Sequence, residues 1–284
     1  MQPADCYTNT MQVADAQQAQ TTLQARALHC LMQVDPQKKV EQTMQLDSDW
    51  QAGHVICDHN VAVKRIKQPG RPARPELVAP RELSKRSAFT VEGRAALIHS
   101  LCHIEFNAIN LALDAVYRFA NMPVEYYSDW LKVAREEASH FRLLSAHLSR
   151  LGARYGDFVA HNGLWEMAVE TDHDVMVRMA LVPRVMEARG LDVTPSIMEK
   201  LRQAGDNQAV EVLEIIHRDE VGHVKIGTHW FRTVCAQRDL EPLSTFKTLL
   251  AQYMKGQLRG PFDHTTRKQA GFTADELAYL EGAG

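Results

Sequence analysis

The feature that most constrains this chain is a pattern that occurs twice: a glutamate, a second glutamate 32 or 33 positions later, and a histidine three positions after that. Its members are Glu105, Glu137 and His140 in the first copy and Glu187, Glu220 and His223 in the second. A Glu-x-x-His pair alone means little, because 13 of the 284 residues are histidine and chance pairs are expected. The long spacing to the upstream glutamate is what restricts the fold.

That spacing predicts pairs of antiparallel helices. Asn121-Met122-Pro123 is a turn signal midway between Glu105 and Glu137, because proline fits the first turn of a helix and not its interior. At about 1.5 Å per residue, both carboxylates lie about 22–24 Å from this turn, and therefore at one level. Residues three apart share a helix face, so Glu137 and His140 point the same way.

The six side chains stand in apolar stripes, as in Ile98, Leu101, Ile109 and Val116 around Glu105. A buried carboxylate is costly unless it is paired or bound to metal. Four glutamates and two histidines from four helices form the ligand set of a two-metal site in a four-helix bundle. Carboxylate-rich ligands favour two iron ions, or alternatively manganese or a mixed Mn/Fe pair. The Glu-x-x-His pairs at Glu170 and Glu214 fall outside these stripes and are interpreted as surface residues.

Acidic neighbours of the ligands are candidates for supporting roles. Glu136 precedes Glu137 and Asp219 precedes Glu220, and each could accept a hydrogen bond from the ligand histidine of the facing helix. The alternative is a surface residue with an arginine or lysine partner. His147 and His217 could line a substrate cavity or be satisfied core histidines, and Cys102 is interpreted as packing. His99 and His103 lie off the Glu105 face and are left out of the site.

The pattern divides the chain into three predicted parts. Residues 1–89 form a helical extension and a basic, proline-rich arm, residues 90–238 the di-metal bundle, and residues 239–284 a helical cover. The predicted helices span residues 10–32, 36–46, 90–120, 123–151, 172–189, a short one from 194, 206–237, 242–258, and a last one from 273. Gly190 is expected to end the fifth helix and Thr194-Pro195 to start the next. Residues 152–171 are expected to form a long crossover.

The arm between residues 47 and 86 has eight basic residues from position 64 onward: Lys64, Arg65, Lys67, Arg71, Arg74, Arg81, Lys85 and Arg86. It is expected to be a solvated arm against the bundle or a neighbouring subunit, a dimer being one option. The alternative is a patch for an anionic substrate such as RNA or a phosphorylated metabolite. The net charge of −3 gives no global attraction to nucleic acid.

Composition indicates an ordinary globular protein, with 45% hydrophobic and 24% charged residues. The sequence contains no run of 18 apolar residues, so no membrane span is predicted. The first residues lack the features of a signal peptide. The five cysteines are scattered and form no C-x-x-C pair, which suits a reducing cytoplasm.

Four segments resemble the ferritin-like di-iron carboxylate superfamily and, more narrowly, an uncharacterised bacterial family within it. They are residues 103–109 (HIEFNAI), 135–141 (REEASHF), 183–190 (PRVMEARG) and 219–223 (DEVGH). The resemblance implies an all-α, ferritin-like four-helix bundle with a long crossover between its second and third helices, and metal at all six patterned residues. A related branch of the superfamily hydroxylates a modified adenosine in tRNA, which implies a hydroxylase only by analogy.

Three functions remain open from the sequence. The first is an O₂-dependent di-iron oxidase or hydroxylase of a small organic or nucleoside substrate. It would need an external reductant, because no Gly-x-Gly-x-x-Gly motif is present. The second is a ferroxidase, an iron-handling protein or a peroxide scavenger, and the third is a non-enzymatic metal-binding protein. The substrate, the reductant, the metal and the oligomeric state stay open.

Overall fold

The chain is all-α over the residues that the structure describes, as the sequence predicts. A computed structural model describes residues 22–83, 86–254, 258 and 260–282. Within these ranges there is no strand, and the β-type pairing is limited to the isolated bridges Thr22–Ile56 and Leu77–Ala160. The predicted helical residues 10–21 lie outside the described ranges.

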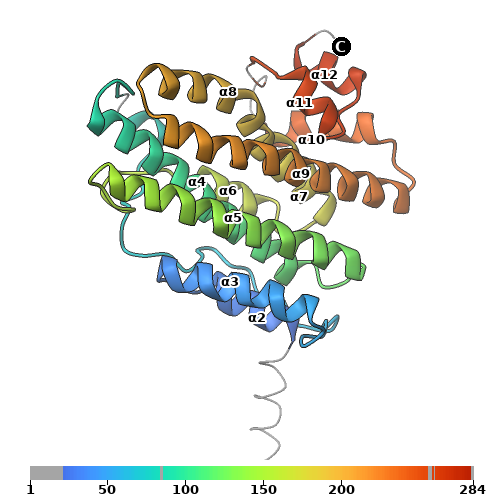
Figure 1. Ribbon diagram of the computed structural model, residues 1–284. Coiled ribbons are helices and arrows are strands. Elements are labelled where there is room, and N and C mark those ends of the chain that lie inside the picture. Colours follow the sequence, from blue (N-terminus) through green and yellow to red (C-terminus); the bar gives the residue numbers. More distant parts are fainter. Residues whose placement is uncertain (1–21, 84–85, 255–257, 259, 283–284) are drawn as a thin grey trace, which may run out of the picture. The chain divides into compact units, whose positions relative to one another are not determined.

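The helices are joined by connections of very different length, the longest being residues 52–79 (Figure 1). In chain order they are α2 (Leu23–Leu31), α3 (Pro36–Gln51), η1 (Pro80–Glu82), α4 (Val91–Arg118), α5 (Val124–Arg150), α6 (Gly163–Glu170), α7 (Val175–Leu181), η2 (Val182–Glu187), α8 (Ala188–Gln203), α9 (Asn207–Gln237), α10 (Pro242–Tyr253), α11 (His264–Gln269) and α12 (Ala274–Leu280).

The chain divides into two compact units whose boundaries fall inside α4 and α5. One unit comprises residues up to Pro72 together with Ala108–Ala138, and the other comprises Ala73–Asn107 and Ser139–Gly284. Both long helices are continuous across the boundary. The domain limits predicted after residues 89 and 238 stay a prediction.

In the first unit, α2 packs against α3 (Figure 1). The start of α3 is as the sequence predicts, because Asp35 caps the helix with its side chain and Pro36 is its first residue. Lys39 on α3 is fully buried, and its Nζ donates hydrogen bonds of 2.8 Å to the carbonyls of Leu31 and Gly70. This lysine therefore ties the middle of the proline-rich arm to the end of α2.

In the second unit, the parts of α4 and α5 that belong to it run antiparallel. The hydroxyl of Ser145 donates to the sulfur of Cys102 at 3.9 Å, and the rings of Phe106 and Phe141 lie 5.6 Å apart. Later residues of one helix thus meet earlier residues of the other. Thr90 caps α4 by accepting a hydrogen bond from the main-chain N–H of Gly93.

Helix α9 runs antiparallel to α5 and along the α7–η2–α8 segment. Asp206 caps its first turn and also lies 3.1 Å from Nε2 of His147 near the end of α5. Arg94 on α4 approaches the same carboxylate at 3.5 Å. This capping residue therefore joins three helices at one end.

The prediction that a helix ends at Gly190 and restarts at Thr194-Pro195 is wrong. Helix α8 is unbroken from Ala188 to Gln203, with Pro195 inside it. Proline removes one helical hydrogen bond, but α8 packs along α9 with Ala188, Leu191 and Leu201 fully buried. Burial of this apolar face, at about 1.5–3 kcal/mol for each large side chain, offsets the lost bond.

Three further elements depart from the expected arrangement. The predicted crossover contains α6, whose Trp165 is buried. The segment η2 is a π-helix, which no signal in the local sequence predicted. Helix α11 forms where the sequence predicted no helix, with Asp263 as its N-cap.

The C-terminal helices of the second unit enclose a buried arginine. Arg184 on η2 is fully buried and its Nη2 lies 2.6 Å from Oε1 of Glu276 on α12. Burial lowers the pKa of Arg184 to about 10, while the charge of Glu276 opposes this, so the guanidinium stays charged. It is also 4.1–4.8 Å from the centres of three rings, those of Phe231, Phe246 and Phe272.

By length and composition alone, α4 could cross a membrane, since its best window has a mean hydropathy of 1.2. Of that window, 72% is buried inside the protein. A core helix of a folded protein passes the same test, so the burial favours that role. A cytoplasmic location of the protein stays a prediction.

Candidate metal centre

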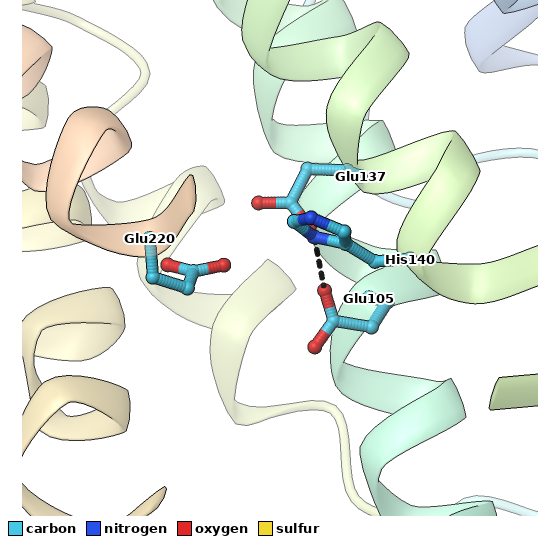
Figure 2. A group of neighbouring side chains, drawn as sticks. All are labelled: Glu105, Glu137, His140 and Glu220. Carbon is cyan, nitrogen blue, oxygen red and sulfur yellow. Dashed lines mark ion pairs between the residues drawn. The ribbon is translucent and has the colours of Figure 1, made fainter. Parts of the chain in front are cut away.

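Four of the six patterned side chains come together in one group (Figure 2). Each of Glu105, Glu137, His140 and Glu220 offers one ligand atom, and these atoms all lie within 4.8 Å of one another. Figure 2 shows the carboxylate of Glu105 paired with the imidazole and the carboxylate of Glu220 reaching toward the group from α9. The first three residues are at most 4% exposed, and the side chain of Glu220 is 13% exposed.

Three helices supply this group. Glu105 comes from α4, Glu137 and His140 from α5, and Glu220 from α9. Helix α5 is continuous, so the three-residue spacing puts Glu137 and His140 on one face one turn apart. The local cause of the arrangement is therefore the Glu-x-x-His spacing recognised in the sequence.

The two ring nitrogens of His140 face different carboxylates. Nδ1 lies 3.3 Å from Oε2 of Glu105, on the side of the cluster, and Nε2 lies 3.2 Å from Oδ2 of Asp219. A carboxylate can only accept, so the hydrogen on Nε2 points to Asp219, and Nδ1 is the nitrogen that would bind a metal ion held by the carboxylates of the group. This is the contact that the sequence predicts for Asp219, and it matches how ligand histidines are commonly held.

His223 adjoins the group from the second copy of the pattern. It is fully buried, its Nδ1 lies 3.5 Å from Oε1 of Glu220, and its ring centre is 5.8 Å from that of His140. Glu187 ends η2 and is partly buried, and η2 packs against α9. These two residues are outside the group of four, and the full set of six ligands stays a prediction.

The second acidic neighbour, Glu136, has surface-type partners. Its carboxylate lies 3.1 Å from Arg135 and 3.6 Å from Lys132. These are the partners expected if Glu136 is a surface residue. A role for Glu136 in holding His223 stays a prediction.

Three other residues considered from the sequence, Cys102, His147 and His217, lie outside the group of four. Burial raises the pKa of the Cys102 thiol to about 12, so it remains protonated and is a poor metal ligand. His147 bonds to Asp206 and acts as a structural link between α5 and α9. Burial lowers the pKa of His217, which the charge of Asp263 partly opposes.

Sequence reasoning missed two histidines on α4. Nε2 of His99 accepts from the main-chain N–H of Gly156 at 2.9 Å, and Nδ1 of His103 lies 2.9 Å from the hydroxyl of Tyr155. Both partners come from the connection that follows α5. The two histidines stand four positions apart, and the connection after α5 is rich in aromatic residues. This is only a weak signal for a contact, because periodicity within one helix does not show which segment packs against it.

A cavity of about 380 Å³ borders the first turns of α4. Its lining includes Arg86, Ala96, Ser100 and Phe158. Ser100 precedes Glu105 by five residues, which is about 7.5 Å along the helix and about 140° around its axis, so this wall of the cavity lies on another face of α4 from Glu105. The volume is within the range of pockets that bind small organic molecules.

The chemistry of the group fits metal ions. Carboxylates gathered in a buried space repel one another, and a divalent cation removes the repulsion and offsets the cost of burial. Oxygen ligands with a minority of imidazole suit iron and manganese better than zinc or copper. The residues present therefore fit the ions that the sequence predicts.

Comparison with known proteins places the chain in a family. The model described as "Protein of unknown function (DUF455)" matches residues 32–278, which include all six patterned residues. The chain belongs to this family. An uncharacterized protein of Haemophilus influenzae is 51% identical to this chain over 216 residues, covering 74% of this chain and 75% of that protein. No solved structure matches the chain. The family description names no activity, so function must be argued from the site.

Proposed function

We propose that this protein is a ferritin-like di-metal carboxylate oxidoreductase that uses two iron ions, or manganese in their place, for O₂-dependent oxidation of a small organic or nucleoside substrate. The observation behind the proposal is the buried group of Glu105, Glu137, His140 and Glu220. When bound, such a metal pair supplies the electrons that reduce O₂. The residues that would hold it are Glu105, Glu137, His140, Glu187, Glu220 and His223.

The arrangement of helices supports the ferritin-like part of the proposal. The segments α4, α5, α7–η2–α8 and α9 supply the six residues, and the connection between α5 and α7 is long and contains α6. Carboxylate and Glu-x-x-His ligands from four helices, with one long crossover, are features of the ferritin-like bundles. A π-helix next to a ligand also favours a functional site, because π-helical turns are frequent there.

The chain's own residues have separable tasks in this proposal. Asp219 holds the tautomer and orientation of His140 through Nε2. The apolar residues around the group, such as Ile109, Leu144 and Val224, are fully buried and keep bulk water away from it.

Anaerobic titration with Fe(II), followed by an O₂ pulse, tests the proposal. We expect saturation at two iron ions per chain and consumption of a stoichiometric amount of O₂. A Glu137→Ala variant should lose at least one of the two ions, whereas Glu214→Gln, at an exposed position of α9, should bind both. Oxidation that continues far beyond two ions per chain would favour the alternative of a ferroxidase or iron-handling protein. Binding without any reaction with O₂ would favour a non-enzymatic metal protein, and absence of binding would refute the proposal.

A further inference from the structure

The C-terminal helices α11 and α12 contact the chain on both sides of Glu187, one of the six residues proposed to bind metal. Three residues before Glu187, Arg184 pairs with Glu276 of α12 at 2.6 Å. Five residues after it, Asp192 of α8 pairs with Arg267 of α11 at 2.7 Å. All four partners are buried and belong to the second unit. The stretch around Glu187 is therefore fixed to the C-terminal helices at both of its ends.

The bonds of Arg267 define one orientation of the first turns of α8. Nε and Nη2 of Arg267 donate to the two carboxylate oxygens of Asp192 at 2.8 and 2.7 Å, and Nη2 also lies 3.3 Å from the carbonyl oxygen of Ala188. A two-point bond between a planar guanidinium and a carboxylate restricts the rotation of both groups. Ala188 directly follows Glu187, so these bonds reach the main chain beside the proposed ligand.

The segment that leads into α11 adds two main-chain contacts. The main-chain N–H of Asp263, the N-cap of α11, donates to Oδ1 of Asp192 at 2.9 Å. In the other direction, Nη1 of Arg189 donates to the carbonyl oxygen of Pro261 at 3.0 Å. The first turns of α8 and the entry to α11 are therefore bound to each other through donors on both sides.

One aromatic ring joins the two buried pairs. Cζ of Arg184 lies 4.8 Å from the ring centre of Phe272, and Cζ of Arg267 lies 5.0 Å from the same centre. Phe272 is buried and stands between α11 and α12. Guanidinium groups are attracted to aromatic faces at such distances. The two pairs and the ring thus form one connected cluster, and displacement of either helix would disturb both pairs.

Buried ion pairs favour one arrangement of a fold more than they stabilise it. Taking the charges out of water offsets much of their attraction. Breaking one pair, however, leaves a buried charge without its partner, so displaced arrangements are strongly disfavoured. Glu187 lies between the two pairs, at the junction where the π-helix η2 passes into α8. The pairs therefore restrict the positions that this junction can take.

We propose that the C-terminal segment, residues 260–280, is a latch that holds the turn around Glu187 in position for metal binding, with Arg267 as its positioning residue. The proposal rests on the proposed function, in which Glu187 is a metal ligand. A guanidinium has only donors and cannot bind a metal ion, so Arg267 acts through Asp192 and Ala188. Loss of the latch should affect the metal ion that Glu187 binds and leave the other ion in place.

The first test uses the full chain without metal. Hydrogen–deuterium exchange of main-chain amides, read by mass spectrometry, is compared between the parent and Arg267→Lys. The lysine keeps the charge but cannot make the two-point bond. We expect exchange of residues 184–192 to become about tenfold faster, as for the loss of one hydrogen bond to a charged group, while residues 139–150 of α5 stay unchanged. Equal exchange of residues 184–192 in both chains would overturn the latch.

A matched control is Arg178→Lys, which changes another buried arginine of the same unit. Nε and Nη2 of Arg178 donate to the hydroxyl of Thr171 and to the carbonyl oxygen of Ala168, so this arginine ties α7 to the end of α6. We expect faster exchange around α6 and exchange of residues 184–192 within about twofold of the parent.

The second test measures Fe(II) binding by anaerobic calorimetry. Arg267→Lys should weaken one of the two ions by about tenfold or more and leave the affinity for the other within about twofold, whereas Arg178→Lys should leave both. A purely structural role of Arg267 would change both affinities together. Arg189→Gln provides a variant that spares the core, because the side chain of Arg189 is 43% exposed. It removes the bond to Pro261 and should weaken the same ion by about threefold.

The outcomes separate the latch from the proposed function. If the parent binds two ions, and Arg267→Lys and Arg189→Gln bind both as tightly, the role of the latch is refuted while the proposed function stands. If the parent binds no iron, the proposed function fails, and the exchange experiment alone decides whether the C-terminal segment holds the turn around Glu187.

Discussion

A glycine on α9 offers a direct test of how η2 is positioned. Gly227 is buried against Pro183, and a Cβ atom at 227 would overlap both Cβ and Cγ of that proline. The pyrrolidine ring cannot rotate away, and Pro183 lies within η2, four residues before Glu187. We therefore expect Gly227→Ala to push η2 away from α9.

The magnitude follows from two opposing effects. Overpacking of a tight contact costs about 1–3 kcal/mol. Alanine in place of glycine within a helix gains about 0.5–1 kcal/mol. The net change in the free energy of unfolding should be a loss of about 0.5–2 kcal/mol, or a few degrees in Tm at about 2–4 °C per kcal/mol.

Gly222 is the matched control, because it lies on the same helix and a Cβ there would meet nothing within 4 Å. Gly222→Ala should therefore stabilise the chain by about 0.5–1 kcal/mol. Thermal and urea unfolding of the metal-free chains measure both changes, and Fe(II) affinity reports whether Glu187 has moved. Equal or greater stability of Gly227→Ala relative to Gly222→Ala would refute the assigned contact with Pro183.

Three further predictions concern individual polar contacts. Asp219→Asn should weaken Fe(II) binding by about 10–100-fold in calorimetry, as for other groups that orient a ligand histidine, while Glu214→Gln should not; equal affinities would contradict the role of Asp219. Burial lowers the pKa of His99 from 6.5 to about 4, so the unfolded chain binds more protons between these pH values and stability is lost as pH falls through them. His99→Gln should reduce this loss in urea unfolding measured across that window, and an unchanged pH profile would argue against it. Arg184→Met should destabilise the chain by about 3–5 kcal/mol in urea unfolding, because it leaves Glu276 buried without its main partner; a change below about 1 kcal/mol would show that Glu276 is not charged there.

The parts of the fold that were predictable depend on short-range chemistry. Asp35, Thr90 and Asp206 each cap a helix start through a bond within three residues, and such bonds are visible in the local sequence. The grouping of Glu105, Glu137 and His140 also follows from spacing alone. These features need no knowledge of the remaining chain.

The parts that were not predictable depend on contacts distant in sequence. Helix α8 continues through Pro195 because its apolar face packs along α9, and nothing near the proline indicates that burial. The bond between His103 and Tyr155 joins residues 52 positions apart through a connection with no regular pattern. Periodicity correctly places His103 off the ligand face but cannot show what lies on the other side.

The two copies of the ligand pattern differ in a way that the unbroken α8 explains. Glu105 stands as far before the end of α4 as Glu137 stands after the start of α5, so the two are level. Glu220 lies equally many residues after the start of α9. Glu187, however, lies more residues before the end of α8 than the other three glutamates lie from their helix ends. At about 1.5 Å per residue, Glu187 is about 4.5 Å out of level, close to one helical turn. A break at residues 190–194 would have absorbed this excess, and because α8 is continuous the offset remains. This accounts for Glu187 lying outside the group of four.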